Sequence, residues 1–306
     1  MKLGISSHTY GWAVGIRGHQ PEHPLSPQAL LDRAAALGVS VVQIADNMPL
    51  HALPAAELRD LERRARALGI DIEVGTRGIA PEHLLAYLRL AVRMHPTPSP
   101  CTRAGVPTPE GAAVLTAGGG TPQAGTAPVL RVVVDTPDHR PSEDEIVGTL
   151  SGMMPDFERE GVVLAIENHD RHTAAQYVSM LERICSPWVA MCLDTANSFG
   201  ALEGPAVVVE ALAPWTANLH VKDFVVARFP HNLGFTIEGR PVGQGQLDVA
   251  WVLERVRNAG RDPNVILEQW TPPQAVLTAG TLEETITKEA AWAVESVAYL
   301  RRLIPD

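Results

Sequence analysis

Short apolar runs rich in β-branched residues alternate with amphipathic segments along most of the chain. Eight such runs predict strands, at residues 3–9, 41–46, 71–76, 129–136, 162–168, 189–195, 217–223 and 264–270. The segment after each run has apolar residues spaced three and four apart, which predicts a helix. Several of these helices would begin at Pro, Ser or Thr and end at Gly. The chain is therefore expected to repeat one strand–helix unit eight times.

Eight strand–helix units in 306 residues favour a closed (β/α)8 TIM barrel, predicted here as a single domain over residues 1–306. The alternative is an open, doubly wound sheet, but no GxGxxG turn follows the first strand. One segment interrupts the repeat: residues 96–128 are rich in Pro, Gly, Thr and Ala, which predicts a flexible insert between the third helix and the fourth strand. Such connections lie on the N-terminal face of a barrel, so we expect the insert to lie away from the chemistry.

Composition narrows the choice of partners to small molecules. The net charge of −10 and the isoelectric point near 5.6 oppose a nucleic-acid-binding surface, which needs Lys and Arg in excess. The first residues lack a secretory signal pattern and no stretch reaches 18 uninterrupted apolar residues, so we expect a cytoplasmic protein without membrane contact. The three cysteines form neither a disulfide framework nor a zinc motif.

Four consecutive predicted strands each end at a possible metal ligand. These residues are Glu167, Asp194, His220 and Glu268. Each alone could be a helix cap or a solvated loop residue, but the C-terminal ends of barrel strands surround one pocket. Three carboxylates and one imidazole suit an oxygen-preferring divalent ion, Mn²⁺ above all, with Mg²⁺ or Co²⁺ as alternatives. The sequence therefore predicts a metal site at the C-terminal face.

The strand-end motifs IENHD, CLDTANS, NLHVKD and ILEQW resemble those of the xylose isomerase-like TIM barrels, which include sugar phosphate isomerases and epimerases. A weaker resemblance, in QIADNMPL, EVGTRGI and NSFGALEGP, is to 3-oxo-isoapionate decarboxylase-like members. The resemblance implies that the four residues above bind the metal and that Glu167 and Glu268 move protons as catalytic residues. It also leaves a homo-oligomer open. In the ketose 3-epimerase branch, however, a histidine and an arginine usually stand where this chain has Asn197 and Val226.

Several further polar residues near strand ends are candidates for binding the substrate. Arginines at positions 77, 171 and 240 would suit a carboxylate or phosphate, although surface ion pairing is an equal alternative. The predicted substrate-binding residues are Arg77, His169, Asn197, Lys222 and Arg240. His8, Tyr10, Trp12, Asp46 and Asn47 are further candidates for the pocket wall.

The leading hypothesis is a metal-dependent sugar or sugar-acid isomerase or epimerase that acts through a metal-stabilised enediolate. The alternative is a metal-dependent decarboxylase of a 3-oxo sugar acid, because loss of CO2 leaves the same enediolate. A DNA-repair nuclease of the same superfamily would need more histidines and a basic groove. A barrel that binds without catalysing is the last alternative, and absence of metal from the purified protein would support it.

Overall fold

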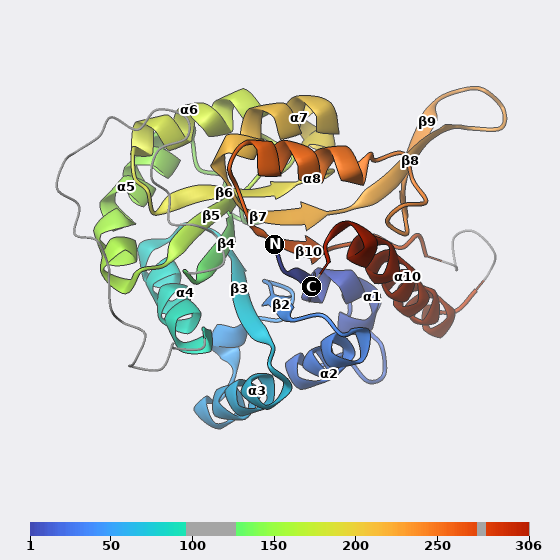
Figure 1. The fold of residues 1–306 in the computed structure, drawn as a ribbon, viewed down its shortest axis with the longest axis horizontal. Helices are drawn as coiled ribbons and strands as arrows, with labels where there is room; N and C mark the ends of the chain where they lie inside the picture. Colours follow the sequence, from blue (N-terminus) through green and yellow to red (C-terminus); the bar gives the residue numbers. More distant parts are fainter. Residues whose placement is uncertain (96–126, 274–279, 306) are drawn as a thin grey trace.

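Eight parallel strands form a closed barrel in the computed structural model, which describes residues 1–95, 127–273 and 280–305 (Figure 1). In spatial order the barrel runs β1, β10, β7, β6, β5, β4, β3, β2. The bounds are β1 (Leu3–Ser6), β2 (Val41–Ile44), β3 (Asp71–Arg77), β4 (Val129–Val133), β5 (Val163–Glu167), β6 (Val189–Asp194), β7 (Thr216–Val221) and β10 (Asn264–Leu267). The predicted TIM-barrel fold is confirmed, and all eight predicted strands are present, several of them shorter than expected.

Helices surround the barrel and cover the outer face of its strands (Figure 1). They are α1 (Gly11–Val14), α2 (Pro27–Leu37), α3 (Ala55–Leu68), α4 (Pro81–Met94), α5 (Glu143–Glu160), α6 (Ala174–Ile184), α7 (Pro205–Leu212), α8 (Val249–Asn258) and α10 (Leu282–Leu303). Ser26, Ser142, Thr173 and Thr281 cap helix N-termini with their hydroxyl groups. Gly38, Gly69 and Gly161 end helices in the left-handed conformation. The start and stop signals read from the sequence therefore operate as expected.

An antiparallel hairpin that the sequence analysis did not predict follows β7. Strands β8 (Asp223–Arg228) and β9 (Phe235–Arg240) pair with Val226 opposite Ile237. Asn232 and Gly234 adopt positive φ in the turn between them. The hairpin projects beyond the ring of helices in Figure 1. Only Lys222 separates it from β7, so the hairpin begins at the C-terminal face of the barrel.

The Pro- and Gly-rich insert predicted at residues 96–128 lies outside the described residues except for its last two positions. Its flanks lie at the N-terminal ends of the strands, where His95 and Ala127 line a small pocket with Asn264. This position agrees with a helix-to-strand connection on the N-terminal face. Among the described helices, none is long and apolar enough to cross a membrane.

Among the described residues, the inside of the barrel holds only small apolar clusters, whereas the main hydrophobic core lies between the strands and the helices. Residues two apart in a strand face the same side, so Glu167 shares the inward face of Val163 and Ala165. Those two belong to small apolar clusters that are separate from the main hydrophobic core. The strand ends above them carry the polar residues that the sequence analysis selected.

Candidate metal centre and active-site pocket

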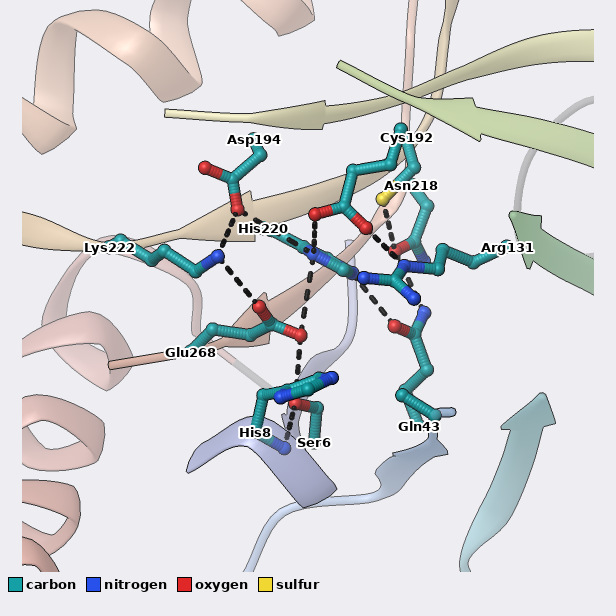
Figure 2. Close-up of polar contacts among 12 residues, drawn as sticks. Ser6, His8, Gln43, Arg131, Cys192, Asp194, Asn218, His220, Lys222 and Glu268 are labelled. Carbon is teal, nitrogen blue, oxygen red and sulfur yellow. Dashed lines mark hydrogen bonds and ion pairs between the residues drawn. The ribbon is translucent and has the colours of Figure 1, made fainter. Parts of the chain in front are cut away.

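The four predicted metal ligands converge at the C-terminal end of the barrel. Figure 2 labels three of them, Asp194, His220 and Glu268. Glu167 ends β5, Asp194 ends β6, His220 lies in β7 opposite Asp194, and Glu268 directly follows β10. One ligand atom from each lies within 4.8 Å of the others. All four side chains are almost completely buried. Residues 101 positions apart in the sequence thus meet in one cluster, as the strand-end argument requires.

The imidazole of His220 is oriented for a metal ion. Its Nδ1 lies 3.4 Å from Glu268 Oε1 and 3.8 Å from both Glu167 Oε1 and Asp194 Oδ2. This nitrogen is buried without a hydrogen-bond partner among the described residues, whereas Nε2 is 2.8 Å from Gln43 Oε1. Two ligands that each lie about 2.1 Å from one small divalent ion are themselves roughly 3–4 Å apart. The donor set and its spacing therefore fit such an ion.

Lys222 places a positive charge at the edge of the cluster. Its Nζ lies 2.8 Å from Asp194 Oδ2 and 3.0 Å from Glu268 Oε2, and it donates to Asn197 Oδ1. Burial acts to lower the pKa of Lys222, but the two carboxylates outweigh it and raise the pKa. Burial acts to raise the pKa of Glu268, but the charges of His220 and Lys222 bring it to about 2. The buried carboxylates of the cluster therefore strongly stabilise a positive charge placed among them, as they do for Lys222.

Arg131 is a central residue of the site that the sequence analysis missed. It projects inward from β4, is 3 % exposed, and forms an ion pair with Glu167 and another, of 2.8 Å, with Asp46. Burial opposes the charge of Glu167, but Arg131 and His220 hold the pKa of that carboxyl well below its usual range. An arginine within the apolar run VLRVVV was a usable signal, because a buried strand rarely carries an unpaired charge.

Asp46, which follows β2, gathers a second group of basic side chains. Besides Arg131 it contacts His8 Nε2 at 3.5 Å and Arg77 Nε at 3.4 Å. Burial acts to raise the pKa of Asp46, but the hydrogen bond to His8 and the charges of Arg131 and Arg77 lower it. His8 and Arg77 are each about one third exposed and hold Asp46 only at long distance. Both therefore retain hydrogen-bonding capacity toward a ligand.

A cavity of about 600 Å³ opens above the cluster. Of the predicted substrate-binding residues, it is lined by Arg77, His169, Asn197 and Lys222. Arg240 does not line it; its guanidinium contacts Glu238 Oε2 at 3.1 Å, and Glu238 does line the cavity. Arg171 forms a two-point ion pair with Asp135, at 2.6 and 3.0 Å. Apolar wall residues include Trp12, Ile16, Ile237 and Trp270.

The last helix contributes a titratable group that no sequence pattern singles out. Glu289 in α10 is buried, lines the cavity, and accepts hydrogen bonds from the backbone N–H groups of Trp12 and Ala13. Burial raises its pKa to about 7. Because Glu289 joins α10 to α1, it supports the wall that carries Trp12.

Comparisons with known proteins agree with this architecture. Residues 122–303 match the model of the xylose isomerase-like TIM barrel family. The chain is 32% identical over 300 residues to 3-oxo-isoapionate decarboxylase of Pectobacterium atrosepticum, covering 98% of this chain and 95% of that protein. The chain belongs to the xylose isomerase-like TIM barrel family.

Solved structures share the fold at low sequence identity. D-psicose 3-epimerase in the presence of D-fructose aligns with a TM-score of 0.66 and 15% identity over 100% of both chains. A xylose isomerase-like TIM barrel protein from Mycobacterium smegmatis in complex with magnesium aligns with a TM-score of 0.63 and 12% identity over 97% of both chains. These likenesses support the fold, and the similarity to the decarboxylase carries more information about chemistry.

Proposed function

We propose that this protein is a metal-dependent carboxy-lyase that removes CO2 from a 3-oxo sugar acid through an enediolate. The observation that carries the proposal is the cluster of four ligands beneath a cavity with basic residues on one side. The 32% identity to a 3-oxo-isoapionate decarboxylase over nearly the whole chain supports this reaction. The strand-end motifs alone favour isomerase or epimerase chemistry first, and the identity to the decarboxylase reverses that order.

Glu167, Asp194, His220 and Glu268 would hold the ion. Such an ion would supply an electrophile that polarises the 3-oxo group and an adjacent hydroxyl group. Mn²⁺ is the ion we expect, with Mg²⁺ or Co²⁺ as alternatives, because carboxylate oxygens dominate the donor set.

The charge balance of the site supports an anionic substrate. Around the ligand cluster the carboxylates are Glu167, Asp194, Glu268 and Asp46, and the side-chain cations are Arg77, Arg131 and Lys222. Two further carboxyl groups line the cavity: Glu238 is paired with Arg240, and burial raises the pKa of Glu289 to about 7. With His220 neutral, as ion binding requires, the groups around the cluster carry one net negative charge, and a divalent ion would change it to one net positive charge. A substrate with one carboxylate restores neutrality in a buried site, where a net charge is costly. A neutral ketose would leave the positive charge in place.

The side chains around the ion have distinct proposed roles. Arg77 and His8, which hold Asp46 only loosely, bind an oxygen-bearing anionic end of the substrate. Lys222 donates a hydrogen bond to the enediolate oxygen as the C–C bond breaks and its electron pair moves toward the former carbonyl. Lys222 lies 3.0 Å from Glu268 and is the source of the proton that replaces CO2 on carbon; Glu268 passes this proton on, and Lys222 regains one from solvent.

The contacts of Glu167 weigh against two-base epimerisation. Its Oε1 accepts a hydrogen bond from Asn197 at 2.6 Å and its Oε2 is paired with Arg131. A carboxylate that is held on both oxygens, with a strongly lowered pKa, is a weak base for a carbon-bound proton. Decarboxylation needs no such proton removal and only one proton delivery. Isomerase or epimerase activity remains the second candidate, because Glu167 and Glu268 both line the cavity.

The test is turnover of the Mn²⁺-loaded protein in D2O on 3-oxo sugar acids, ketoses and sugar phosphates, followed by NMR and CO2 detection. We expect CO2 in proportion to substrate, with one deuterium on the carbon that lost it. Deuterium beside a ketose carbonyl without CO2 would establish the isomerase or epimerase instead. Glu268→Gln is the inactive control, and Arg240→Gln, which alters a residue outside the cavity lining, is the matched active control.

A further inference from the structure

A hydrogen-bonded network of amide and carboxylate side chains crosses the barrel interior beneath the proposed metal site. His220 Nε2 is 2.8 Å from Gln43 Oε1, and Gln43 Nε2 donates to Glu73 Oε2 at 3.1 Å. Asn218 Nδ2 donates to Glu73 Oε2 at 2.8 Å and Asn264 Nδ2 to Glu73 Oε1 at 2.7 Å. Figure 2 shows Gln43 reaching toward His220 from the side away from Asp194 and Glu268. This hydrogen-bonded network therefore ends on His220, the one imidazole among the four proposed ligands.

Glu73 is unusual for its position. Bulky branched apolar residues usually fill the interior of such a barrel, and a buried carboxylate is costly unless donors compensate it. Burial raises the pKa of Glu73, and the hydrogen bonds from Asn264, Gln43 and Asn218 act against this. All three groups that point at its oxygens are N–H donors, as an ionised carboxylate requires.

Two hydrogen bonds determine the orientation of Gln43. Its NH2 group donates to Glu73 Oε2 and to Asn218 Oδ1, which turns its Oε1 toward His220. An amide oxygen only accepts, so His220 Nε2 must carry the hydrogen. In the neutral ring the lone pair then lies on Nδ1, the atom that faces the three carboxylates at 3.4–3.8 Å.

We infer that Glu73, acting through Gln43, is a positioning residue that holds His220 in the Nε2–H tautomer and keeps Nδ1 free to bind an ion. The metal-binding part of this inference rests on the proposed function, whereas the tautomer can be tested without it. Partners that orient a metal-binding histidine typically change metal affinity ten- to hundredfold when they are removed.

The first experiment is ¹⁵N NMR of histidine-labelled, metal-free protein. Burial acts to lower the pKa of His220, but Glu268 and Glu167 outweigh it and raise the pKa, so spectra are recorded at a pH high enough to deprotonate the ring and distinguish its two tautomers. We expect the Nε2–H form in the wild type and a gain of the Nδ1–H form in Gln43→Met and Glu73→Leu. A wild-type ring in the Nδ1–H form would overturn the inference.

The second experiment measures Mn²⁺ affinity by titration calorimetry. We expect Gln43→Met and Glu73→Leu to bind Mn²⁺ ten- to hundredfold more weakly. Ser296→Ala, which removes another buried hydrogen bond, to Val242 N, controls for general loosening and should bind within about twofold of wild type. The double variant Gln43→Glu with Glu73→Gln keeps an acceptor on His220 Nε2 and should restore affinity. Wild-type affinity in both folded single variants would contradict the inference, whereas a wild type that binds no Mn²⁺ would refute the proposed metal dependence alone.

Discussion

The guanidinium of Arg131 and the carboxylate of Glu167 form a buried ion pair between the adjacent strands β4 and β5. This pair connects the proposed metal site to Asp46 and thus to the basic side of the cavity. A buried charge that loses its partner is strongly destabilising, whereas an exposed pair contributes little.

Replacing Arg131 should therefore cost stability even without metal. We expect Arg131→Met to lower the free energy of unfolding by about 3–5 kcal/mol in the presence of EDTA, because Glu167 loses its partner. Urea denaturation provides the measurement. Arg63→Met, which breaks an exposed pair with Asp60, should change the value by only about 0.5 kcal/mol. Equal effects of the two substitutions would contradict the assignment.

Metal binding should stabilise the protein through the four ligands. At a Mn²⁺ concentration of about 100 times Kd, the wild type should gain about 2.7 kcal/mol of stability, and Asp194→Asn should gain almost none. Thermal unfolding with and without Mn²⁺ measures this difference. Glu238→Gln changes a carboxylate in the cavity wall outside the ligand set and should keep the full response. A response retained by Asp194→Asn would remove Asp194 from the site.

Stability should fall in acid through Glu268. Its pKa is about 2 in the folded protein against a usual value of 4.5, so its contribution is complete above pH 4.5 and is lost as the pH falls toward 2. Urea denaturation of metal-free protein at pH 5 and pH 3 should show a smaller loss for Glu268→Gln than for the wild type. Identical losses would mean that Glu268 does not carry this dependence.

Ionisation of Glu289 should make the folded protein less stable as the pH rises, which is the opposite of the effect of Glu268. Its pKa of about 7 is above the usual 4.5, so the folded state binds the proton more tightly and loses stability as the pH rises from 4.5 to 7. Glu289→Gln keeps an acceptor for the N–H groups of Trp12 and Ala13 without the charge. We expect this variant to be more stable than the wild type at pH 8 by on the order of 1–3 kcal/mol, and equal to it near pH 4. A stability difference that does not change between these pH values would exclude ionisation as its cause.

Arg77 should determine affinity for an acidic substrate. Loss of a charge-assisted hydrogen bond of about 1.5–3 kcal/mol predicts that Arg77→Met raises KM roughly ten- to hundredfold, with a smaller change in kcat. Steady-state kinetics on the substrate found by CO2 release would measure this. Arg171→Met, which breaks an ion pair with Asp135, is the matched control and should leave KM within about threefold. A KM effect of Arg171→Met as large as that of Arg77→Met would contradict the proposed role.

The sequence predicted the barrel and its four convergent polar residues because both depend on local patterns. Strand–helix alternation determines the fold class, and strand ends meet on one face regardless of their order in the chain. Glu167, Asp194, His220 and Glu268 could therefore be selected before any coordinates were known. Their roles as ligands stay a prediction.

To select the residues that were missed, one would need to know the register of each strand and which of its side chains point into the barrel. Strands of a parallel barrel are buried on both faces, so their sequences do not show which residues point inward. Gln43, Glu73 and Arg131 are polar residues within such strands, and each is paired with a residue of another strand. Glu73 also accepts a hydrogen bond from Asn218, which lies far along the chain in β7. The hairpin after Lys222 was missed because its strands alternate only over a few residues around a turn with Asn232 and Gly234.

That hairpin is an addition to the barrel, yet its second strand contributes Ile237 and Glu238 to the cavity wall. The four proposed ligands, in contrast, all belong to barrel strands or to the residue that directly follows one. One part of the cavity wall can therefore vary with the hairpin while the strand ends that carry the proposed ligands and Arg77 stay in place. A change in the length or polarity of residues 223–240 would alter the shape of the cavity without altering the barrel beneath it.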